Sequence, residues 1–159
     1  SLPLRKKNFL HPIALLDALL KENIDSTESV DKKEQQLLSV CDALIEKPIL
    51  DGALEIIDGN SALTIRHITS PTRTAYLVQT SSGRSKGNRS NVSHYYCQTE
   101  LPYCSCRSYF ERAKVDPKAL CKHLLAIKLL PYLTNSEIHV EKIVEERFAS
   151  LVVEAAFSD

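Results

Sequence analysis

Several features of other protein classes are missing from this sequence of 159 residues. No apolar run approaches the roughly 18 residues that a membrane span needs, and the N-terminus lacks the charged, apolar and small-residue segments of a secretion signal. We therefore expect an intracellular protein with no membrane span. The chain begins with Ser1 and contains no methionine, so we interpret its native start as missing or processed, and a targeting segment upstream stays open.

Signatures of nucleotide-binding enzymes are also absent. The sequence contains neither the Gly-x-x-x-x-Gly-Lys-Ser/Thr loop that holds phosphates nor a dinucleotide-binding fingerprint. It does contain five cysteines. An odd number of cysteines in a chain without secretory features argues for metal binding or buried thiols rather than a disulfide framework.

A net positive charge is the third absence, because 20 basic residues balance 20 acidic ones. A neutral total argues against affinity for nucleic acid through overall charge. The charges are nevertheless unevenly distributed, since residues 22–58 carry ten acids and three bases, whereas residues 59–99 carry no acid at all. The sequence therefore has a basic centre between acidic segments.

The N-terminal segment, residues 1–58, is predicted to be helical. Pro12 suits the first turn of a helix that extends to about Lys21. A second helix is expected to begin near Ser29 or Asp31 and to end at Pro48, with Cys41 on its apolar face. Residues 51–59 fit either a helical turn or a short strand, and both remain open at this point.

The central segment, residues 59–131, is expected to contain a small antiparallel sheet of about three strands. Residues 62–69 and 74–80 are rich in β-branched and apolar side chains and flank a turn sequence, which predicts a hairpin. Residues 81–91 are rich in serine, glycine and asparagine and form a basic loop before a third strand at 92–99.

Further helices complete the expected α+β fold. A short helix is predicted at 108–114. After it comes an almost wholly apolar helix that Pro131 stops, and a helix that is apolar all round should be buried. In the C-terminal segment, residues 132–159, Ser136 is expected to cap a long amphipathic helix that carries Ile138 and Phe148.

The most informative motif consists of two ligand pairs, Cys104 with Cys106 and Cys121 with His123. Zinc favours four tetrahedral thiolate or imidazole ligands, and two local pairs separated by a loop are typical of structural sites. Four such ligands leave no position for a reacting water, so we predict one structural zinc ion. The alternative is that buried thiols and a surface histidine lie close in sequence by coincidence.

The spacing of the second pair restricts where the apolar helix begins. Residues two apart in an α-helix point about 200° apart, so Cys121 and His123 cannot both bind the metal from the interior of a helix. We expect Cys121 in the turn before the helix and His123 in its first turn, where free backbone N–H groups stabilise a thiolate. Cys97 is interpreted as a half-buried strand residue, with a spare thiol near the metal as the alternative.

The order of three strands, Cys-x-Cys, a short helix and Cys-x-His before an apolar helix resembles the SWIM zinc-finger domain, over about residues 60–131. Three segments narrow the resemblance to the SWIM-containing subunit of the Shu complex: Tyr103-Cys104-Ser105-Cys106, Leu120-Cys121-Lys122-His123-Leu124-Leu125-Ala126 and Ile68-Thr69-Ser70-Pro71. The resemblance implies a non-enzymatic nuclear protein that pairs with a RecA-like recombinase paralogue. The pair would promote assembly or stability of recombinase filaments on single-stranded DNA in homologous recombination repair.

Two other functions remain as alternatives. The segment 59–99 would bind single-stranded nucleic acid directly if its basic side chains neutralised phosphates and a tyrosine stacked on a base. The candidate contacts are Arg84, Lys86, Arg89, Tyr95 and Tyr96. An enzymatic role, such as a metal-dependent hydrolase or a ubiquitin-ligase accessory domain, would need an open metal position, which the four ligands do not leave.

Overall fold

The computed structural model describes residues 11–24, 29–59, 64–81, 92–133 and 138–157. The chain forms two compact units, residues 1–45 and residues 46–159. None of the helices in the described ranges has both the length and the apolar character that crossing a membrane requires.

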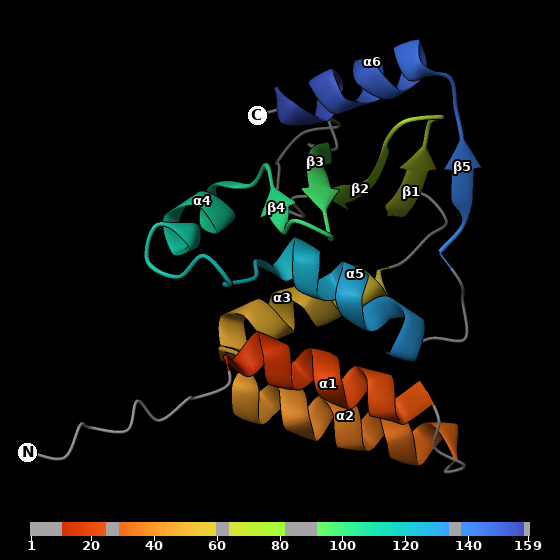
Figure 1. The fold of residues 1–159 in the computed structure, drawn as a ribbon. Helices are drawn as coiled ribbons and strands as arrows, with labels where there is room; N and C mark the ends of the chain where they lie inside the picture. The colour runs from red at the N-terminus through yellow and green to blue at the C-terminus, as the bar shows by residue number, and fades with distance from the viewer. Residues whose placement is uncertain (1–10, 25–28, 60–63, 82–91, 134–137, 158–159) are drawn as a thin grey trace, which may run out of the picture. The chain divides into compact units, whose positions relative to one another are not determined.

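The described residues of the first unit form two helices, α1 (Pro12–Ile24) and α2 (Val30–Leu44), which pack against each other (Figure 1). Both were predicted, although α1 extends three residues beyond Lys21. In α2 the Cys41 side chain is fully buried, and this burial raises the pKa of its thiol to about 11. Cys41 is therefore an unreactive core residue, as its place on the apolar face indicates.

The second unit begins with α3 (Lys47–Asp58). The prediction for Pro48 was wrong, because Pro48 lies in the first turn of α3 and α2 has already ended at Leu44. Proline suits this position, since its fixed φ is helical and the first-turn N–H has no partner in the helix. The segment 51–59, left open from the sequence, is helical up to Asp58.

A five-stranded mixed sheet forms the middle layer of the second unit (Figure 1). Its order is β4-β3-β2-β1-β5, and neighbouring strands are antiparallel except for β1 and β5, which are parallel. The predicted three antiparallel strands are present, but the sheet has an extra short strand at each edge. The strands are β1 (Ile65–Thr69), β2 (Thr74–Ser81), β3 (Val92–Gln98), β4 (Tyr103–Cys104) and β5 (Val140–Lys142).

Helices cover both faces of this sheet (Figure 1). On one face, α6 (Glu145–Ala156) packs its Phe148 and Leu151 side chains onto Ile68 and Leu77 in one buried apolar cluster. On the other lies α5 (Lys122–Leu133), whose side chains are buried nearly all round, as predicted. The helix α4 (Arg107–Ala113) follows β4.

Two expectations for the C-terminal half need correction. Pro131 does not stop α5 but lies inside its last turn, where its missing N–H removes only one helical hydrogen bond. The last helix does not include Ile138, because β5 forms at Val140–Lys142 and α6 begins only at Glu145. The predicted cap, Ser136, lies outside the described residues.

A glycine allows α3 to approach the start of α5. A Cβ atom at Gly52 would lie 2.8 Å from Cδ of Lys122, so a larger residue would have to displace that side chain. Lys122 stands between Cys121 and His123. The α3–α5 contact therefore supports the segment that carries the second ligand pair.

Candidate metal centre

The four predicted ligands come together from three elements. Cys104 ends β4, Cys106 is the N-cap of α4, Cys121 immediately precedes α5 and His123 lies in the first turn of α5. All four side chains are buried, and one donor atom from each lies within 4.8 Å of the other three. The segments that precede two helices thus converge on one point beside the edge of the sheet.

Local hydrogen bonds orient the first pair. The N–H of Ser105 donates to the carbonyl of Tyr96 at 3.0 Å, and the Ser105 hydroxyl accepts from the N–H of Tyr96, also at 3.0 Å. These contacts hold the residue between the two cysteines against β3. Cys104 can then share one centre with Cys106, the residue that begins α4.

Two of the sulfur atoms lie at helix N-termini. Sγ of Cys106 accepts from the N–H of Tyr109 at 3.3 Å, and Sγ of Cys121 accepts from the N–H of Leu124 at 3.5 Å. Free N–H groups at a helix start stabilise negative charge. Both cysteines are therefore placed to act as thiolates, as the sequence predicted for Cys121.

His123 presents Nδ1 to the sulfur atoms. This nitrogen lies 3.7 Å from Sγ of Cys104 and 3.9 Å from Sγ of Cys121. A tetrahedral zinc site with Zn–S of about 2.3 Å and Zn–N of about 2.0–2.1 Å places such donors about 3.6 Å apart. The observed spacings match that arrangement, so Nδ1 is the nitrogen that faces the metal position.

The three crowded thiols need a cation. The hydrogen bond to Cys106 raises the pKa of the Cys104 thiol, and the bond to Cys104 raises that of Cys121, while the bond from Cys104 lowers the pKa of Cys106. Without a cation, the cluster favours only one thiolate. A divalent ion removes this limit because a coordinating thiol is deprotonated outright.

These residues fit zinc in its closed structural form. Three thiolates and one imidazole are a typical donor set for such sites and fill all four tetrahedral positions. When bound, the ion supplies a cross-link between β4, the start of α4 and the start of α5. The ring of Tyr95 on β3 stacks on His123 with centroids 4.1 Å apart, which fixes the imidazole from the sheet side.

The comparison with known proteins agrees with this site. The chain is 36% identical to mouse "Zinc finger SWIM domain-containing protein 7" over 91 residues, which are 55% of this chain and 52% of that protein. The chain is a distant homologue of a SWIM zinc-finger protein. It spans about half the length of this curated relative. No model of a known protein family matches the chain, and no solved structure matches it.

The structure does not bring the predicted nucleic-acid contacts together as it does the four metal ligands. Arg84, Lys86 and Arg89 lie outside the described residues. Tyr95 stacks on His123, and Tyr96 packs beside the apolar cluster under α6. Within the described residues, both tyrosines thus have structural roles in β3.

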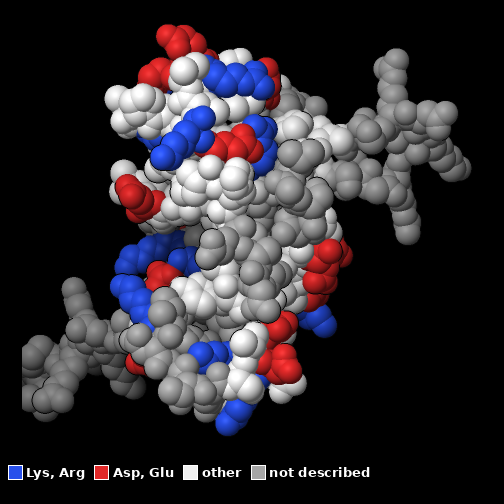
Figure 2. Space-filling model, turned by 90° about the vertical axis from the view of Figure 1, so that its right-hand side faces the viewer, with Lys and Arg blue, Asp and Glu red and all other residues white. Residues whose placement is uncertain are grey.

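The other basic residues of segment 59–99 do not form an open patch either. Arg66 is paired with Glu141, and Arg73 with Glu145. Figure 2 shows basic and acidic side chains of the described residues next to one another in the upper part of the face that it draws. Direct binding of nucleic acid thus depends on residues 82–91, which lie outside the described residues.

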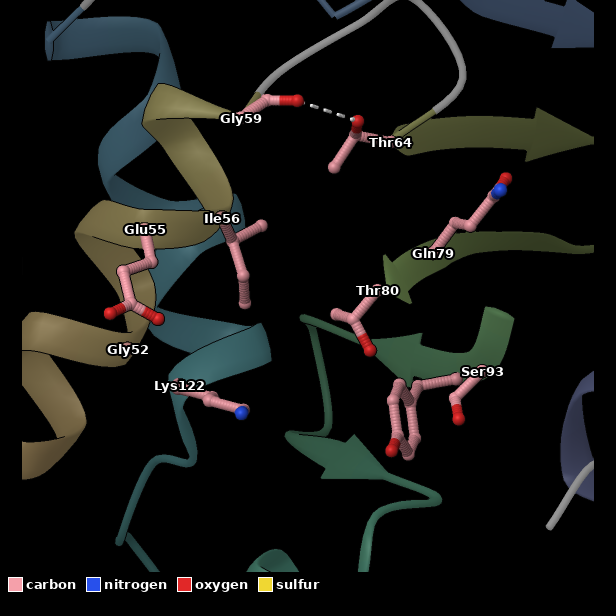
Figure 3. A pocket seen from close by; sticks show the side chains of 10 residues that line it. Gly52, Glu55, Ile56, Gly59, Thr64, Gln79, Thr80, Ser93 and Lys122 are labelled. Carbon is pink, nitrogen blue, oxygen red and sulfur yellow. Dashed lines mark hydrogen bonds between the residues drawn. The ribbon is translucent and has the colours of Figure 1, made fainter. Parts of the chain in front are cut away.

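Two cavities flank the metal centre. One of about 530 Å³ lies between α3, the start of α5 and the ends of β2 and β3, with Lys122 and Thr80 projecting into it (Figure 3). The other, of about 460 Å³, is lined by Ser105, Arg107 and the C-terminal end of α6. Tyr95 lines both cavities and contacts His123, so open space comes within one side chain of this ligand.

Sequence reasoning missed one residue of this centre and gave another only as an alternative. It gave Tyr95 no contact with His123. It interpreted Cys97 as half-buried, with a spare thiol near the metal as the alternative, and that alternative is correct. The structure shows Cys97 fully buried, with Sγ 3.5 Å from Sγ of Cys104. The alternation of side chains along β3 indicates that residues 95 and 97 lie on the same face of the sheet. Only the pairing of β3 with β4 shows that this face is the one toward the metal centre.

Proposed function

We propose that this chain is a non-enzymatic, zinc-stabilised interaction subunit of a Shu-type complex. It pairs with a RecA-like recombinase paralogue, and the heterodimer promotes assembly or stability of recombinase filaments on single-stranded DNA during homologous recombination repair. Any ATPase activity belongs to the partner, and the complex acts in the nucleus.

The observation that carries the proposal is the closed ligand set in a homologue of a SWIM protein. With Cys104, Cys106, Cys121 and His123 all directed at one point, the metal has no open position for substrate or water. Such a site contributes folding energy rather than chemistry. A domain held rigid in this way suits the presentation of a surface to another protein.

Apolar side chains that the fold leaves exposed support an interaction role. Phe157, the C-cap of α6, is 81% exposed, and Val153 one turn earlier is 55% exposed. On α4, Phe110 is 46% exposed beside Tyr103 and Tyr109. Aromatic residues are enriched at protein interfaces and commonly carry much of their binding energy.

Co-purification of the full chain with candidate recombinase paralogues tests the proposal, with the metal content measured on the same sample. We expect a stable complex that carries one zinc per copy of this chain. Recovery of a zinc-loaded, folded monomer that binds none of the paralogues would contradict it.

A matched pair of surface variants locates the interface. Phe157→Ser should weaken paralogue binding, because it removes an exposed aromatic anchor from α6. Leu101→Ser changes a side chain that is similarly exposed, at 84%, but belongs to the turn between β3 and β4, and it should leave binding unchanged. If the two variants changed paralogue binding to the same extent, α6 would not be part of the interface.

A further inference from the structure

A fourth thiol lies against the zinc ligands without being one of them. Cys97 on β3 is the register partner of Cys104 on β4. Both side chains have no exposed surface, and their sulfur atoms are 3.5 Å apart. Cys97 is not part of the four-residue cluster whose donor atoms all lie within 4.8 Å of one another, so it contacts the site through Cys104.

The strand pairing favours a covalent bond between these two cysteines. The N–H of Ser105 donates to the carbonyl of Tyr96 and the N–H of Tyr96 donates to the Ser105 hydroxyl, so residues 96 and 105 take the place of a hydrogen-bonded pair. Their neighbours Cys97 and Cys104 are then a non-hydrogen-bonded pair, in which Cα atoms approach to about 4.5 Å. That typical separation lies within the range of about 4.4–6.8 Å that disulfides span, so the strand register is compatible with a bond.

We propose that Cys97 is the resolving thiol of the zinc centre: when a peroxide oxidises Cys104, Cys97 captures it as a disulfide and the metal is released. The Cys104 thiolate attacks one peroxide oxygen, the O–O bond breaks, and Cys104 becomes a sulfenic acid while hydroxide leaves. Cys97 sulfur then attacks the sulfenic sulfur, and its proton leaves with the displaced hydroxide as water. One peroxide is reduced and two sulfurs are oxidised by one electron each.

Cys97 differs from the other thiols because the metal does not hold it. Cys106 and Cys121 are ligands whose sulfurs also accept N–H bonds from Tyr109 and Leu124. The sulfur of Cys97 contacts Cys104 directly across the β3–β4 pair. It is thus the thiol that can reach the sulfenic acid while the remaining ligands stay in place.

A cavity comes within one residue of Cys104 along the chain. The cavity of about 460 Å³ is lined by Ser105, which separates Cys104 from Cys106, and by Tyr95, which stacks on His123. Full burial of Cys104 makes its oxidation slow, because susceptibility follows exposure. The disulfide then removes one of four ligands, and reduction by a thiol restores it.

The test uses the zinc-loaded full chain treated with hydrogen peroxide, with released zinc followed by a colorimetric chelator. Peptide mapping without reduction identifies the disulfide. We expect zinc release to accompany a Cys97–Cys104 disulfide, and thiol reductant plus zinc to restore the metal content. A main product that links two of Cys104, Cys106 and Cys121, or a sulfinic acid without disulfide, would overturn the proposal.

Two variants supply the controls. Cys41→Ala removes a buried thiol of the first unit and should behave as the wild-type chain does. Cys97→Ala should lose zinc to peroxide but recover severalfold less of it after reduction, because its sulfenic acid is oxidised further to irreversible products. Recovery of zinc equal to that of the wild-type chain would contradict the proposal. If Cys97→Ala fails to fold, peptide mapping of the oxidised wild-type chain still tests the proposal. The inference concerns the metal centre alone and holds whichever partner the chain binds.

Discussion

The two edges of the sheet are held by different chemistry. At the β4 edge, three cysteines and a histidine form a site for one metal ion, which would join β4 to α5. At the β5 edge, Arg66 on β1 donates two hydrogen bonds, of 2.9 and 2.8 Å, to the carboxylate of Glu141. One edge depends on a cofactor, and the other depends on the chain alone.

The difference predicts which perturbations each edge resists. A structural zinc ion contributes on the order of 10–16 kcal/mol of binding free energy to the fold of small domains, whereas a surface ion pair contributes about 0.2–1 kcal/mol. The β5 edge compensates with the apolar cluster under α6, where Phe148 is almost fully buried. The β4 edge should therefore respond to chelators and oxidants, and the β5 edge to salt, acid and loss of apolar contacts.

Removal of a zinc ligand should have the largest effect. Cys104→Ser or His123→Ala leaves a three-ligand site, so the second unit should lose its metal and its cooperative melting, and partner binding should disappear with the fold. Circular dichroism and thermal melting measure this, with Cys41→Ala as the control that keeps both metal and fold. Native-like melting with selective loss of binding would mean that the ligands touch the partner.

Truncation of Phe148 should rank second. Phe148→Ala opens a cavity beside Ile68 and Leu77 and removes the ring over which the Arg73 guanidinium lies at 4.8 Å, at a cost of about 3–5 kcal/mol in the free energy of unfolding. Urea denaturation measures the loss, and Phe148→Leu should lose less. The zinc content should stay at one per chain. Loss of zinc in folded Phe148→Ala would show that the two edges are coupled.

The Arg66–Glu141 pair should make a smaller contribution. Its side chains are 24% and 29% exposed, so solvent screening limits the coupling in a double-mutant cycle to about 1 kcal/mol. Added salt should reduce that coupling. The matched control is Lys114–Glu111, a pair that is 69% and 60% exposed at 3.4 Å and should show almost no coupling. Equal coupling in the two pairs would mean that Arg66–Glu141 does not hold the β5 edge.

Acid should produce the smallest effect. Hydrogen bonds, above all the one from the hydroxyl of Thr72, lower the pKa of Glu145 from its usual 4.5 to about 2. The hydrogen bonds from the Thr72 N–H and from Arg73 contribute to this lowering of the pKa in the same direction. A carboxylate with a lowered folded-state pKa stabilises the fold above its unfolded pKa, and the stabilisation is lost as the pH falls through the folded value. The contribution should therefore decline from about pH 4.5 toward pH 2.

The comparison of wild type with Glu145→Gln isolates this contribution, because protonation of the metal ligands is common to both chains. The stability difference between them should shrink as the pH falls through that window. A difference that stays constant with pH would mean that the Glu145 carboxylate does not titrate with folding.

Local patterns in the sequence predicted the metal centre better than they predicted the sheet. The placement of Cys121 before α5 and His123 in its first turn follows from helix geometry alone, as does the burial of an all-apolar helix. The hairpin of β1 and β2 follows from two β-branched runs around a turn. Each of these depends on residues close together in the chain.

The parts that failed depend on distant partners. The apolar spacing through Ile138 and Ile143 fits a helix, yet Val140–Lys142 pairs in parallel with β1, some 70 residues away. No local pattern indicates that pairing. Likewise, Tyr95 contacts His123 only because α5 packs on β3, so this contact could not be predicted from spacing. For Cys97 the sequence offered a place near the metal only as an alternative, and the pairing of β3 with β4 decides it.

X-ray absorption at the zinc edge on the folded, purified chain tests the central claim most directly, together with the metal stoichiometry. The account predicts one zinc per chain with three sulfur neighbours at about 2.3 Å and one nitrogen at about 2.0–2.1 Å. A folded chain that holds much less than one zinc, or a zinc that keeps a water oxygen in place of one of the four side chains, would contradict it.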